Sequence, residues 1–324
     1  MRVVHFNETT PELPDDLVEA LRAFPQVTLA AVGDPGALPA ALRDAEIMIV
    51  NNRSYTPANA KIIRDNAAAL RWIQFSTSGT DNGAKHGFPP GIVVTNVAGL
   101  RAFSVAEQAF ALMLALVRQV RATEKARDRT DWCRDAITPA VDNLAGKHLV
   151  ILGMGAVGQD AARKAKAFDM QVTGVTRATG AMRNADRLRP RSEMVAACAE
   201  ADMVLIAAGH DASTDKFFGR EALAAMKPTA YVINVARGQL VDEPALIEAL
   251  KANRIAGAGL DVTFTEPTPK DHVFWDMPNV MMSPHIGGAG SAGTGGGLGA
   301  IFADNLALWL KGEALNKIVV AKTA

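Results

Sequence analysis

The sequence predicts an α/β protein with two doubly wound, parallel-sheet domains, and three observations lead to this fold class. The chain has 324 residues, enough for two domains of about 100 to 200 residues each. Short apolar segments alternate with amphipathic helical segments in both halves. A glycine-rich turn at residues 153–158 joins one such strand to a helix. Because strand–helix alternation is typical of parallel βαβ units, each half is expected to form its own parallel sheet.

The first half supplies the first of these sheets. Apolar segments bounded by polar or turn residues predict strands, and the stretch at 15–24 has the periodicity of a helix. The segment STSGTDNG after the fourth strand contains only turn-forming residue types and an acid, so we expect a loop there. One α/β unit therefore extends to about residue 98. The predicted strands are 2–6, 27–30, 46–50, 71–75 and the apolar part of 91–99.

A long apolar helix is predicted next, at residues 104–119. Ser104 and Glu107 have the spacing of a capping box at its start. The helix is expected to be largely buried, either in the core of the protein or in a dimer interface. We prefer the dimer, so a homodimer is the expected assembly.

The second half predicts a complete doubly wound domain over residues 99–289. A helix at 300–310 and a strand at 317–320 then return to the first unit, so residues 1–98 plus 290–324 make the other domain. The glycine-rich stretch at 287–297 marks the second crossing, and we hypothesise that it flexes when the domains close. The six predicted strands are 148–152, 171–176, 203–207, 231–235, 255–261 and 280–283.

Composition excludes several classes of protein. Lys plus Arg and Asp plus Glu are both 34, so the formal net charge is +0 and no global field favours nucleic acid or an anionic membrane. Hydrophobic residues make up 49% and charged residues 21%, as in globular rather than disordered chains. We therefore expect no nucleic-acid partner.

Cysteine content and hydropathy bear on the compartment. Cys133 and Cys198 lie far apart without a CxxC spacing, so neither a disulfide framework nor a zinc site is indicated and no metal is expected. The first residues lack the apolar segment of a signal peptide. The apolar run at 109–117 is well short of the roughly 18 residues that span a bilayer. We expect a cytoplasmic protein with no membrane partner.

Residues 153–158 form a G-x-G-x-x-G motif between a predicted strand and a predicted helix. The apolar run LVIL precedes it, and a helical segment follows. Glycines permit a tight turn and the close approach of a pyrophosphate, which backbone N–H groups and the positive end of the helix dipole then stabilise. The sequence thus predicts a dinucleotide site; the alternative is an ordinary glycine-rich turn. The residues expected to contact the cofactor are Gly153, Gly155, Ala156, Val157 and Gly158.

The end of the next strand indicates which dinucleotide is preferred. Domains that prefer NAD carry an acidic residue about 20 residues downstream of the glycines, where it binds the ribose 2′-hydroxyl. Here Thr176 and Arg177 occupy that region, and the next carboxylate is Asp186. Arg177 can bind a 2′-phosphate, so NADP(H) is the expected cofactor and NAD(H) a possible one. The alternative is that Arg177 is an ordinary solvated arginine; Arg183 is a weaker second candidate.

Three segments at predicted strand ends carry one Arg, one Glu and one His. They are NVARG with Arg237, DVTFTEP with Glu266 and SPHIGG with His285. Ligands of doubly wound sheets bind at the carboxyl ends of strands, so all three can face one nicotinamide. Arg237 would bind and polarise a keto acid, and His285 would protonate its oxygen, with Glu266 raising the pKa of His285. Each residue alone is also compatible with a purely structural role.

These segments together resemble the D-isomer-specific 2-hydroxyacid dehydrogenase family. The order G-x-G-x-x-G, N-x-x-R-G, D-V-x-x-x-E-P, P-H-x-G-G is highly specific, and STSGTDNG, TNVAG and the helix FSVAEQAFALMLALVR extend the match along nearly the whole chain. The resemblance implies a Rossmann domain inserted in a flavodoxin-like substrate domain. It also gives Arg237, Glu266 and His285 the three catalytic places.

The same resemblance implies further site residues. Asp261 would hold the nicotinamide carboxamide, backbone amides at Ser78 and Gly79 would hold the substrate carboxylate, and Arg53 would add positive charge over it. Three more residues, Ala207, Ala236 and Gly287, are expected to line the cofactor site.

The expected activity is NADPH-dependent reduction of a small 2-keto acid, such as glyoxylate or hydroxypyruvate, to a D-2-hydroxy acid. The basic residue after the second strand is similar to that of NADPH-using reductases in the family, and Glu266 argues against the formate dehydrogenase branch. Phosphite oxidation stays open. A nucleotide-sensing, corepressor-like binding protein on the same fold is the alternative from another class.

Aromatic residues do not identify the substrate's side chain. Trp72, Trp132, Trp275 and Phe103 could each line a pocket or fill a core, and for any one of them a core position is the safer prediction.

Overall fold

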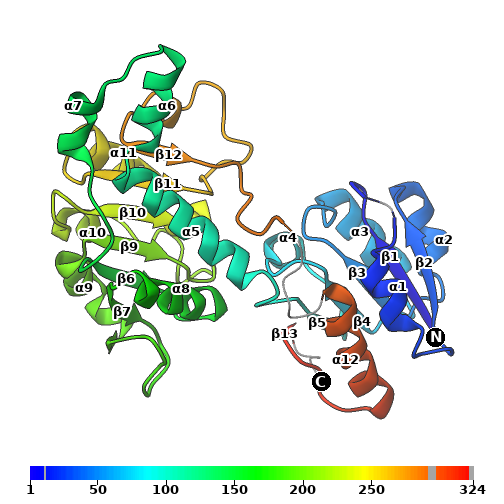
Figure 1. Cartoon of the computed structure of the whole chain (residues 1–324). Coiled ribbons are helices and arrows are strands. Elements are labelled where there is room, and N and C mark those ends of the chain that lie inside the picture. The colour runs from blue at the N-terminus through cyan, green and yellow to red at the C-terminus, as the bar shows by residue number, and fades with distance from the viewer. Residues whose placement is uncertain (11, 291–296, 321–324) are drawn as a thin grey trace. The chain divides into compact units, whose positions relative to one another are not determined.

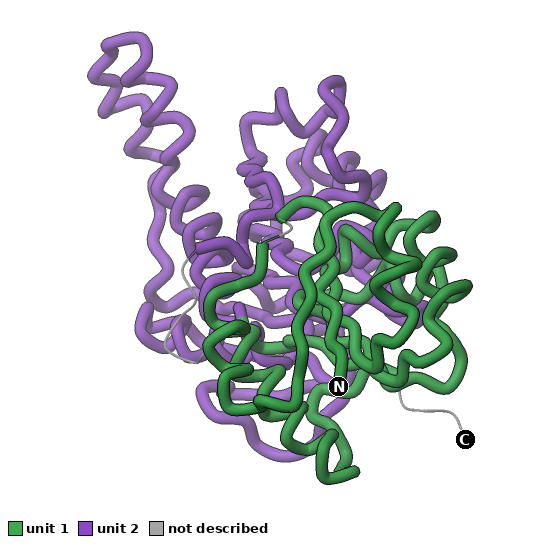
Figure 2. Tube along the Cα trace, turned by 90° about the vertical axis from the view of Figure 1, so that its right-hand side faces the viewer, with its two compact units in different colours: residues 1–100, 291–324 green, residues 101–290 purple. Residues whose placement is uncertain are grey.

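The structure, a computed structural model, describes residues 1–10, 12–290 and 297–320, and the chain divides into two compact units. The first comprises Met1–Leu100 with Ser291–Ala324, and the second Arg101–Gly290 (Figure 2). Each unit is a parallel sheet with helices on both faces, so the predicted fold class is confirmed. Residues 291–296 of the glycine-rich stretch lie outside the described residues, and with them most of the segment that was predicted to flex.

The sheet of the first unit has the order β13-β5-β4-β3-β1-β2 (Figure 1). Its strands are parallel except β13, which the tail adds antiparallel to β5. The central strands are apolar on both faces, as expected for a parallel sheet covered by helices. The bounds are β1 Arg2–Phe6, β2 Thr28–Val32, β3 Ile47–Val50, β4 Trp72–Phe75, β5 Val93–Thr95 and β13 Ile318–Val320.

Two helix layers cover this sheet. Buried residues of α1 and α12 pack on one face, where Trp72 stacks on Phe302 at 5.1 Å between ring centroids. Buried residues of α2 and α3 pack on the other face. The core prediction is therefore right for Trp72. The helices are α1 Asp15–Leu21, α2 Leu38–Leu42, α3 Pro57–Asn66, α4 Asp81–His86 and α12 Leu298–Lys311, with a 3-10 turn at Pro35–Ala37.

The sheet of the second unit has the order β12-β11-β10-β9-β6-β7-β8, and all its pairs are parallel. Six of these strands were predicted. The edge strand β8 was not, because its sequence RLR is short and polar and pairs on one side only. The bounds are β6 His148–Leu152, β7 Gln171–Val175, β8 Arg187–Arg189, β9 Met203–Ile206, β10 Tyr231–Asn234, β11 Gly257–Leu260 and β12 Val280–Met282.

Helices α5 and α8 pack on one face of this sheet, and α9, α10 and α11 on the other. Two short helices, α6 and α7, follow α5. The bounds are α5 Ala102–Val117, α6 Val120–Asp128, α7 Arg134–Ile137, α8 Ala156–Ala167, α9 Met194–Glu200, α10 Arg220–Ala225 and α11 Glu243–Lys251. Short 3-10 turns lie at Thr138–Ala140, Arg191–Glu193, Gly238–Leu240 and Val273–Trp275.

The predicted capping box on α5 is wrong. The helix begins at Ala102 with Arg101 as its N-cap residue, and no side chain caps it, so Ser104 lies inside the first turn. Alanine is the strongest helix former, and nothing in the sequence stops the helix from extending past Ser104. The buried side of α5 packs in the core of its own unit, which accounts for its apolar sequence without a second chain.

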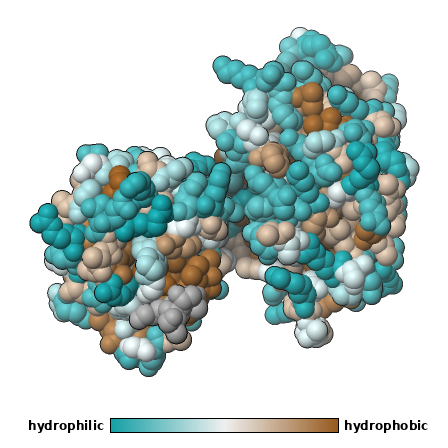
Figure 3. Space-filling view, turned by 180° about the vertical axis from the view of Figure 1, so that it is seen from behind, coloured by the Kyte–Doolittle hydropathy of each residue, from teal (hydrophilic) through white to brown (hydrophobic). Residues whose placement is uncertain are grey.

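Large apolar side chains are exposed at scattered positions. Trp132 is 91% exposed and Trp275 is 47% exposed, so the prediction of a core position is wrong for these two residues. The face seen in Figure 3 is largely hydrophilic, with apolar residues in small separate patches. Over the described ranges no single helix is long and apolar enough to cross a membrane; α5 and α6 satisfy that test only as a pair bent by 64°.

Candidate active site

The G-x-G-x-x-G turn lies between β6 and α8, as predicted, and two of its glycines are sterically required. Gly153 has φ +104, and a Cβ there would lie 2.6 Å from Ala208 Cα. A Cβ on Gly158 would lie 2.1 Å from the Gly153 carbonyl oxygen. The turn is therefore closed by backbone contacts that no larger residue allows.

The first turn of α8 faces the space where a pyrophosphate would lie. Gly155 is the N-cap residue, no side chain caps the helix, and a Cβ on Gly155 would meet nothing within 4 Å. Ala156 and Val157 are the first helical residues. A helix start without a side-chain cap presents N–H groups and the positive end of the helix dipole, which suits a phosphate.

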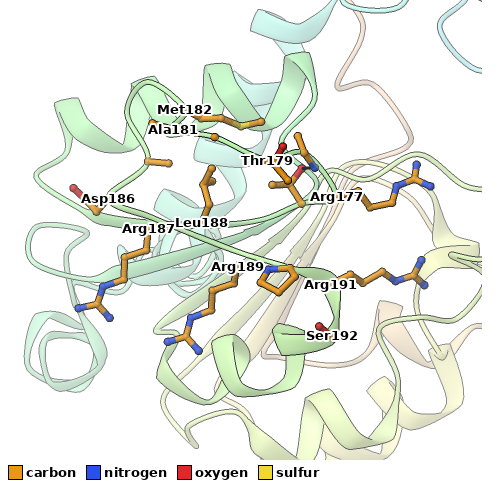
Figure 4. Close-up of a pocket in the computed structure, with 15 residues that line it drawn as sticks. Arg177, Thr179, Ala181, Met182, Asp186, Arg187, Leu188, Arg189, Arg191 and Ser192 are labelled. Atoms are coloured by element: carbon orange, nitrogen blue, oxygen red, sulfur yellow. Dashed lines mark hydrogen bonds between the residues drawn. The ribbon is translucent and has the colours of Figure 1, made fainter.

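A pocket of about 700 Å³ lies beyond the end of β7, and Thr176 and Arg177 both line it (Figure 4). The next acid downstream, Asp186, also lines the pocket, but its carboxylate accepts the Lys166 ammonium and, at 2.7 Å, the Val172 N–H. The hydrogen bond from Lys166 is the largest of the effects that lower the pKa of Asp186. The strand end thus offers a cation and a hydroxyl in place of a ribose-binding carboxylate.

Arg191 is a second basic residue of this pocket, which sequence analysis missed. In Figure 4 Arg177 and Arg191 extend to one side of the pocket, and Arg187 and Arg189 to the other. Arg191 donates to the Ser213 hydroxyl at 3.2 Å and lies 5.2 Å from the centre of the Phe217 ring. The weaker candidate Arg183 does not line the pocket. Only the arginine-rich composition of 187–191 could have indicated Arg191.

The positive charge of Arg177 also acts on Asp211, which lies in the loop after β9 that begins at Ala207. Asp211 in that loop accepts hydrogen bonds from the Ser213 hydroxyl, at 2.6 Å, and from backbone N–H groups. These bonds lower the pKa of Asp211, and the positive charge of Arg177 contributes to the lowering. Arg177 is thus electrostatically coupled to a loop at the cofactor end of the sheet.

Arg237 follows β10, and the buried Asn234 shapes the turn that presents it. The Asn234 side chain accepts the Ala236 N–H at 3.1 Å and donates to the Arg237 carbonyl at 2.9 Å. The Arg237 guanidinium itself donates to the Ala236 carbonyl at 2.6 Å. The N-x-x-R-G spacing therefore builds a turn that is closed by its own asparagine.

Glu266 and His285 form a hydrogen-bonded pair. His285 Nδ1 lies 2.6 Å from Glu266 Oε2, and both side chains are 36% exposed. The other carboxylate oxygen of Glu266 accepts the Thr263 N–H at 3.3 Å. Burial alone would raise the pKa of Glu266, but the hydrogen bond from His285 and the positive charges of His285 and Arg237 outweigh it and lower this pKa. The structure thus pairs Glu266 directly with His285, and the positive charge of Arg237 contributes to the lowering of the Glu266 pKa.

The pairing fixes the roles of the two ring nitrogens of His285. An ionised carboxylate can only accept, so Nδ1 carries hydrogen and donates to Glu266. Nε2 is left as the nitrogen that can give or take a proton, which is the arrangement of a general acid or base oriented by a carboxylate.

The backbone at His285 is held by Asp261, whose side chain is only 2% exposed. His285 has φ +54, a left-handed conformation that is uncommon for a residue other than glycine. The Asp261 carboxylate accepts the Ser283 hydroxyl at 2.6 Å and the Ile286 and Gly287 N–H groups at 3.0 and 2.8 Å. In this structure Asp261 therefore stabilises the turn that carries His285, and its contact with a nicotinamide carboxamide stays a prediction.

The residues expected to bind a substrate carboxylate lie in the first unit. Ser78 and Gly79 follow β4; the Ser78 hydroxyl donates to the Val97 carbonyl at 3.2 Å, and the Gly79 carbonyl accepts the Thr77 hydroxyl at 2.8 Å. Among the described residues, no partner takes a hydrogen bond from either backbone N–H. The exposed Arg53 lies in the turn after β3. The loop is thus internally braced and has backbone donors available to an anion.

The described ranges contain no group of three or more His, Cys, Asp or Glu side chains that could hold a metal ion.

Comparison with known proteins places the chain in a family. The model of the D-isomer specific 2-hydroxyacid dehydrogenase NAD binding domain matches residues 110–287. The D-3-phosphoglycerate dehydrogenase of Methanocaldococcus jannaschii is 31% identical over 96% of this chain, which spans 58% of that protein's length. The glyoxylate reductase of Pyrococcus furiosus is 36% identical over 69% of this chain and 68% of its own.

The fold is shared with solved structures. An NADPH-dependent glyoxylate/hydroxypyruvate reductase from Sinorhizobium meliloti has a TM-score of 0.81 at 23% identity, covering 98% of this chain and 97% of that chain. The family model covers more than half of the sequence, and the matched range contains the turn after β6 and the strand ends described above. The chain therefore belongs to the D-isomer-specific 2-hydroxyacid dehydrogenase family of oxidoreductases, and its second unit is the NAD-binding domain.

Proposed function

We propose that this protein reduces a small 2-keto acid to a D-2-hydroxy acid with NADPH. The observation that carries the proposal is the 2.6 Å contact between His285 and Glu266, together with the charge of Arg237 acting on the same carboxylate. An acid that is oriented by a carboxylate, beside a guanidinium, is what the reduction of a carbonyl next to a carboxylate requires.

A dinucleotide held at the turn after β6 would supply a hydride to the carbonyl carbon, and this chain's residues would stabilise and protonate the carbonyl oxygen. Arg237 binds the keto acid and polarises its carbonyl, so that negative charge on the oxygen is stabilised as it forms. His285 donates the Nε2 proton to that oxygen, and Glu266 stabilises the ring through Nδ1. The hydride and this proton together convert the C=O group to an H–C–O–H group, and the neutral His285 regains a proton from solvent.

The proposed substrates are glyoxylate and hydroxypyruvate. A relative that is 36% identical is a glyoxylate reductase, and the Ser78 and Gly79 N–H groups with Arg53 offer donors and charge for a carboxylate. Another relative is a D-3-phosphoglycerate dehydrogenase. A larger, phosphorylated 2-hydroxy acid is therefore the competing substrate class.

The preference for NADPH rests on the end of β7. Arg177 and Arg191 extend to the same side of the pocket there, and Asp186 is paired with Lys166. A 2′-phosphate gains charge-assisted hydrogen bonds from such a pair, whereas the ribose 2′-hydroxyl of NAD lacks the carboxylate it usually uses.

The test is the initial rate of nicotinamide absorbance loss with glyoxylate, hydroxypyruvate or 3-phosphohydroxypyruvate, each with NADPH and with NADH. We expect the fastest loss with NADPH and one of the two small acids. His285→Asn should lower kcat by roughly 100- to 10,000-fold, since general acid catalysis contributes about that much. His210→Asn is the matched control, because His210 also contacts a carboxylate, Asp215, at 3.1 Å in the same unit.

Three outcomes would overturn the proposal. Turnover of the phosphorylated acid alone would replace the substrate class. Binding of NADPH without turnover of any keto acid would favour a nucleotide-sensing protein, and oxidation of phosphite with NADP⁺ would assign a different reaction.

A further inference from the structure

The loop that carries Glu266 has little packing of its own. Residues 264–267 are exposed, and the Phe264 side chain is 41% exposed. Phe264 nevertheless has both of its backbone polar groups engaged by side chains that follow β10. Hydrogen bonds, rather than buried apolar surface, therefore hold this loop in place.

The carbonyl of Phe264 is held from the segment that carries Arg237. Gln239 Nε2 donates to it at 2.9 Å. Gly238 brings the two segments into direct contact, because a Cβ on this residue would lie 2.1 Å from the Thr263 carbonyl carbon. Arg237 and the Glu266 loop are thus joined through their neighbours in sequence.

The N–H of the same residue is held from the start of α11. It donates to Glu243 Oε2 at 2.9 Å, and Glu243 Oε1 lies 3.3 Å from His272 Nε2. His272 Nδ1 accepts the Phe274 N–H at 3.4 Å, so the hydrogen of a neutral ring is on Nε2 and points to Glu243. The Glu243 side chain is only 16% exposed and both its oxygens are engaged.

We propose that Gln239 and Glu243 are positioning residues for Glu266. They hold the Phe264 peptide from both sides and so fix the loop in which Glu266 meets His285; Thr263, which donates to Glu266, immediately precedes Phe264. This inference rests on the proposed function of Glu266 and His285. Among the described residues, neither side chain hydrogen-bonds to Glu266 or His285, so their effect passes through the loop backbone.

The main test compares variants at Glu243 with a control on the same helix. Glu243→Ala removes the acceptor for the Phe264 N–H and should lower kcat by roughly 10- to 100-fold, with the KM for NADPH little changed, because small displacements of catalytic groups cost rates of this size. Glu243→Gln keeps a carbonyl oxygen for that N–H and should restore most of kcat. Glu248→Ala removes a carboxylate of α11 that pairs with Arg220 on the surface and should leave kcat unchanged.

A second measurement does not depend on turnover. Hydrogen exchange at the Phe264 amide should accelerate at least tenfold in Glu243→Ala and remain at the wild-type rate in Glu248→Ala. Gln239→Ala should lower kcat in the same direction as Glu243→Ala. Unchanged exchange in Glu243→Ala would overturn the proposal even if the wild-type protein reduces no keto acid, which separates its failure from that of the proposed function.

A double-mutant cycle tests the route of the effect. If Glu243 acts through Glu266, adding Glu243→Ala to a Glu266→Gln protein should lower kcat by less than twofold. The full 10- to 100-fold loss in that background would show that Glu243 acts on stability or on another group, and would overturn the assignment.

Discussion

Replacing Asp261 by asparagine should destabilise the second unit more than a typical substitution does. Asparagine has nearly the same volume, so no cavity forms and the change is confined to charge and hydrogen bonding. The native carboxylate accepts three hydrogen bonds, from the Ser283 hydroxyl and from the Ile286 and Gly287 N–H groups. An amide has one acceptor oxygen and one NH₂ group, so it cannot satisfy all three donors.

The size of the effect follows from these contacts. The new amide can be oriented in two ways, and the better one satisfies two of the three donors. It keeps the amide oxygen towards Ser283 and Ile286 and turns the NH₂ group towards the Gly287 N–H, which is left without an acceptor. A buried unsatisfied donor costs about 1 to 3 kcal/mol, and the two remaining bonds lose their charge-assisted strength. We expect a loss of about 2 to 4 kcal/mol in the free energy of unfolding, or roughly 4 to 16 °C in Tm for a unit of this size.

Scanning calorimetry of the whole chain measures this loss. Ser283→Ala is the graded control, because it removes one of the three donors to Asp261 and leaves both backbone bonds. It also removes the acceptor of the Gln108 side chain, so we expect a loss of about 1 to 2 kcal/mol for it. If Asp261→Asn melts within about 2 °C of the wild type, the carboxylate does not support the turn and the reasoning is refuted.

Three further predictions concern the cofactor, the acid–base pair and the assembly. Arg177→Ala should raise the KM for NADPH by roughly 10- to 100-fold and leave that for NADH nearly unchanged, and equal effects would return Arg177 to an ordinary surface arginine. Because the pKa of Glu266 is lowered from 4.5, its ionised form adds stability above that pH and the contribution is lost as pH falls through the lowered pKa. The difference in Tm between wild type and Glu266→Gln should therefore shrink below pH 4.5, and a constant difference from pH 6 to 3 would contradict the pairing. We expect a homodimer, and a monomer in analytical ultracentrifugation at micromolar concentration would contradict this expectation.

A strand could be predicted wherever the hydropathy pattern of its own residues matches the burial of that strand in the sheet. The strand at Arg2–Phe6 was predicted with its bounds, since an apolar run between polar residues is what a covered parallel strand requires. The strand at Arg187–Arg189 could not be predicted, because it forms only by pairing with β7 at the sheet edge. The start of α5 was misjudged because a capping pattern at Ser104 says nothing of residues that extend the helix before it.

The site was predictable where backbone geometry dictates residue type. Gly158 is required by a contact with the nearby Gly153, and Gly153 itself has φ +104, so this local geometry makes the turn recognisable from sequence alone. The contact of Gly153 with Ala208 exists only once the sheet has formed. Arg191 and Gln239 had no such signal. Each bonds to a segment more than 20 residues away, and this proximity exists only once the sheet has formed.

Two carboxylates hold His285 in different ways, and this difference predicts different mutant behaviour. Asp261 is buried and binds the backbone that follows the left-handed His285, so its loss should first reduce stability. Glu266 is 36% exposed and binds the ring of His285 and the Thr263 N–H, and hydrogen bonds at such partly exposed sites contribute about 1 kcal/mol or less each to folding. Glu266→Gln should therefore lower kcat by roughly 100-fold or more while Tm changes by less than about 4 °C. The opposite result would be a Glu266→Gln variant that is the less stable of the two and an Asp261→Asn variant that is the less active at a temperature where both are folded. That result would mean that Asp261 acts on the bound nicotinamide and that Glu266 is structural.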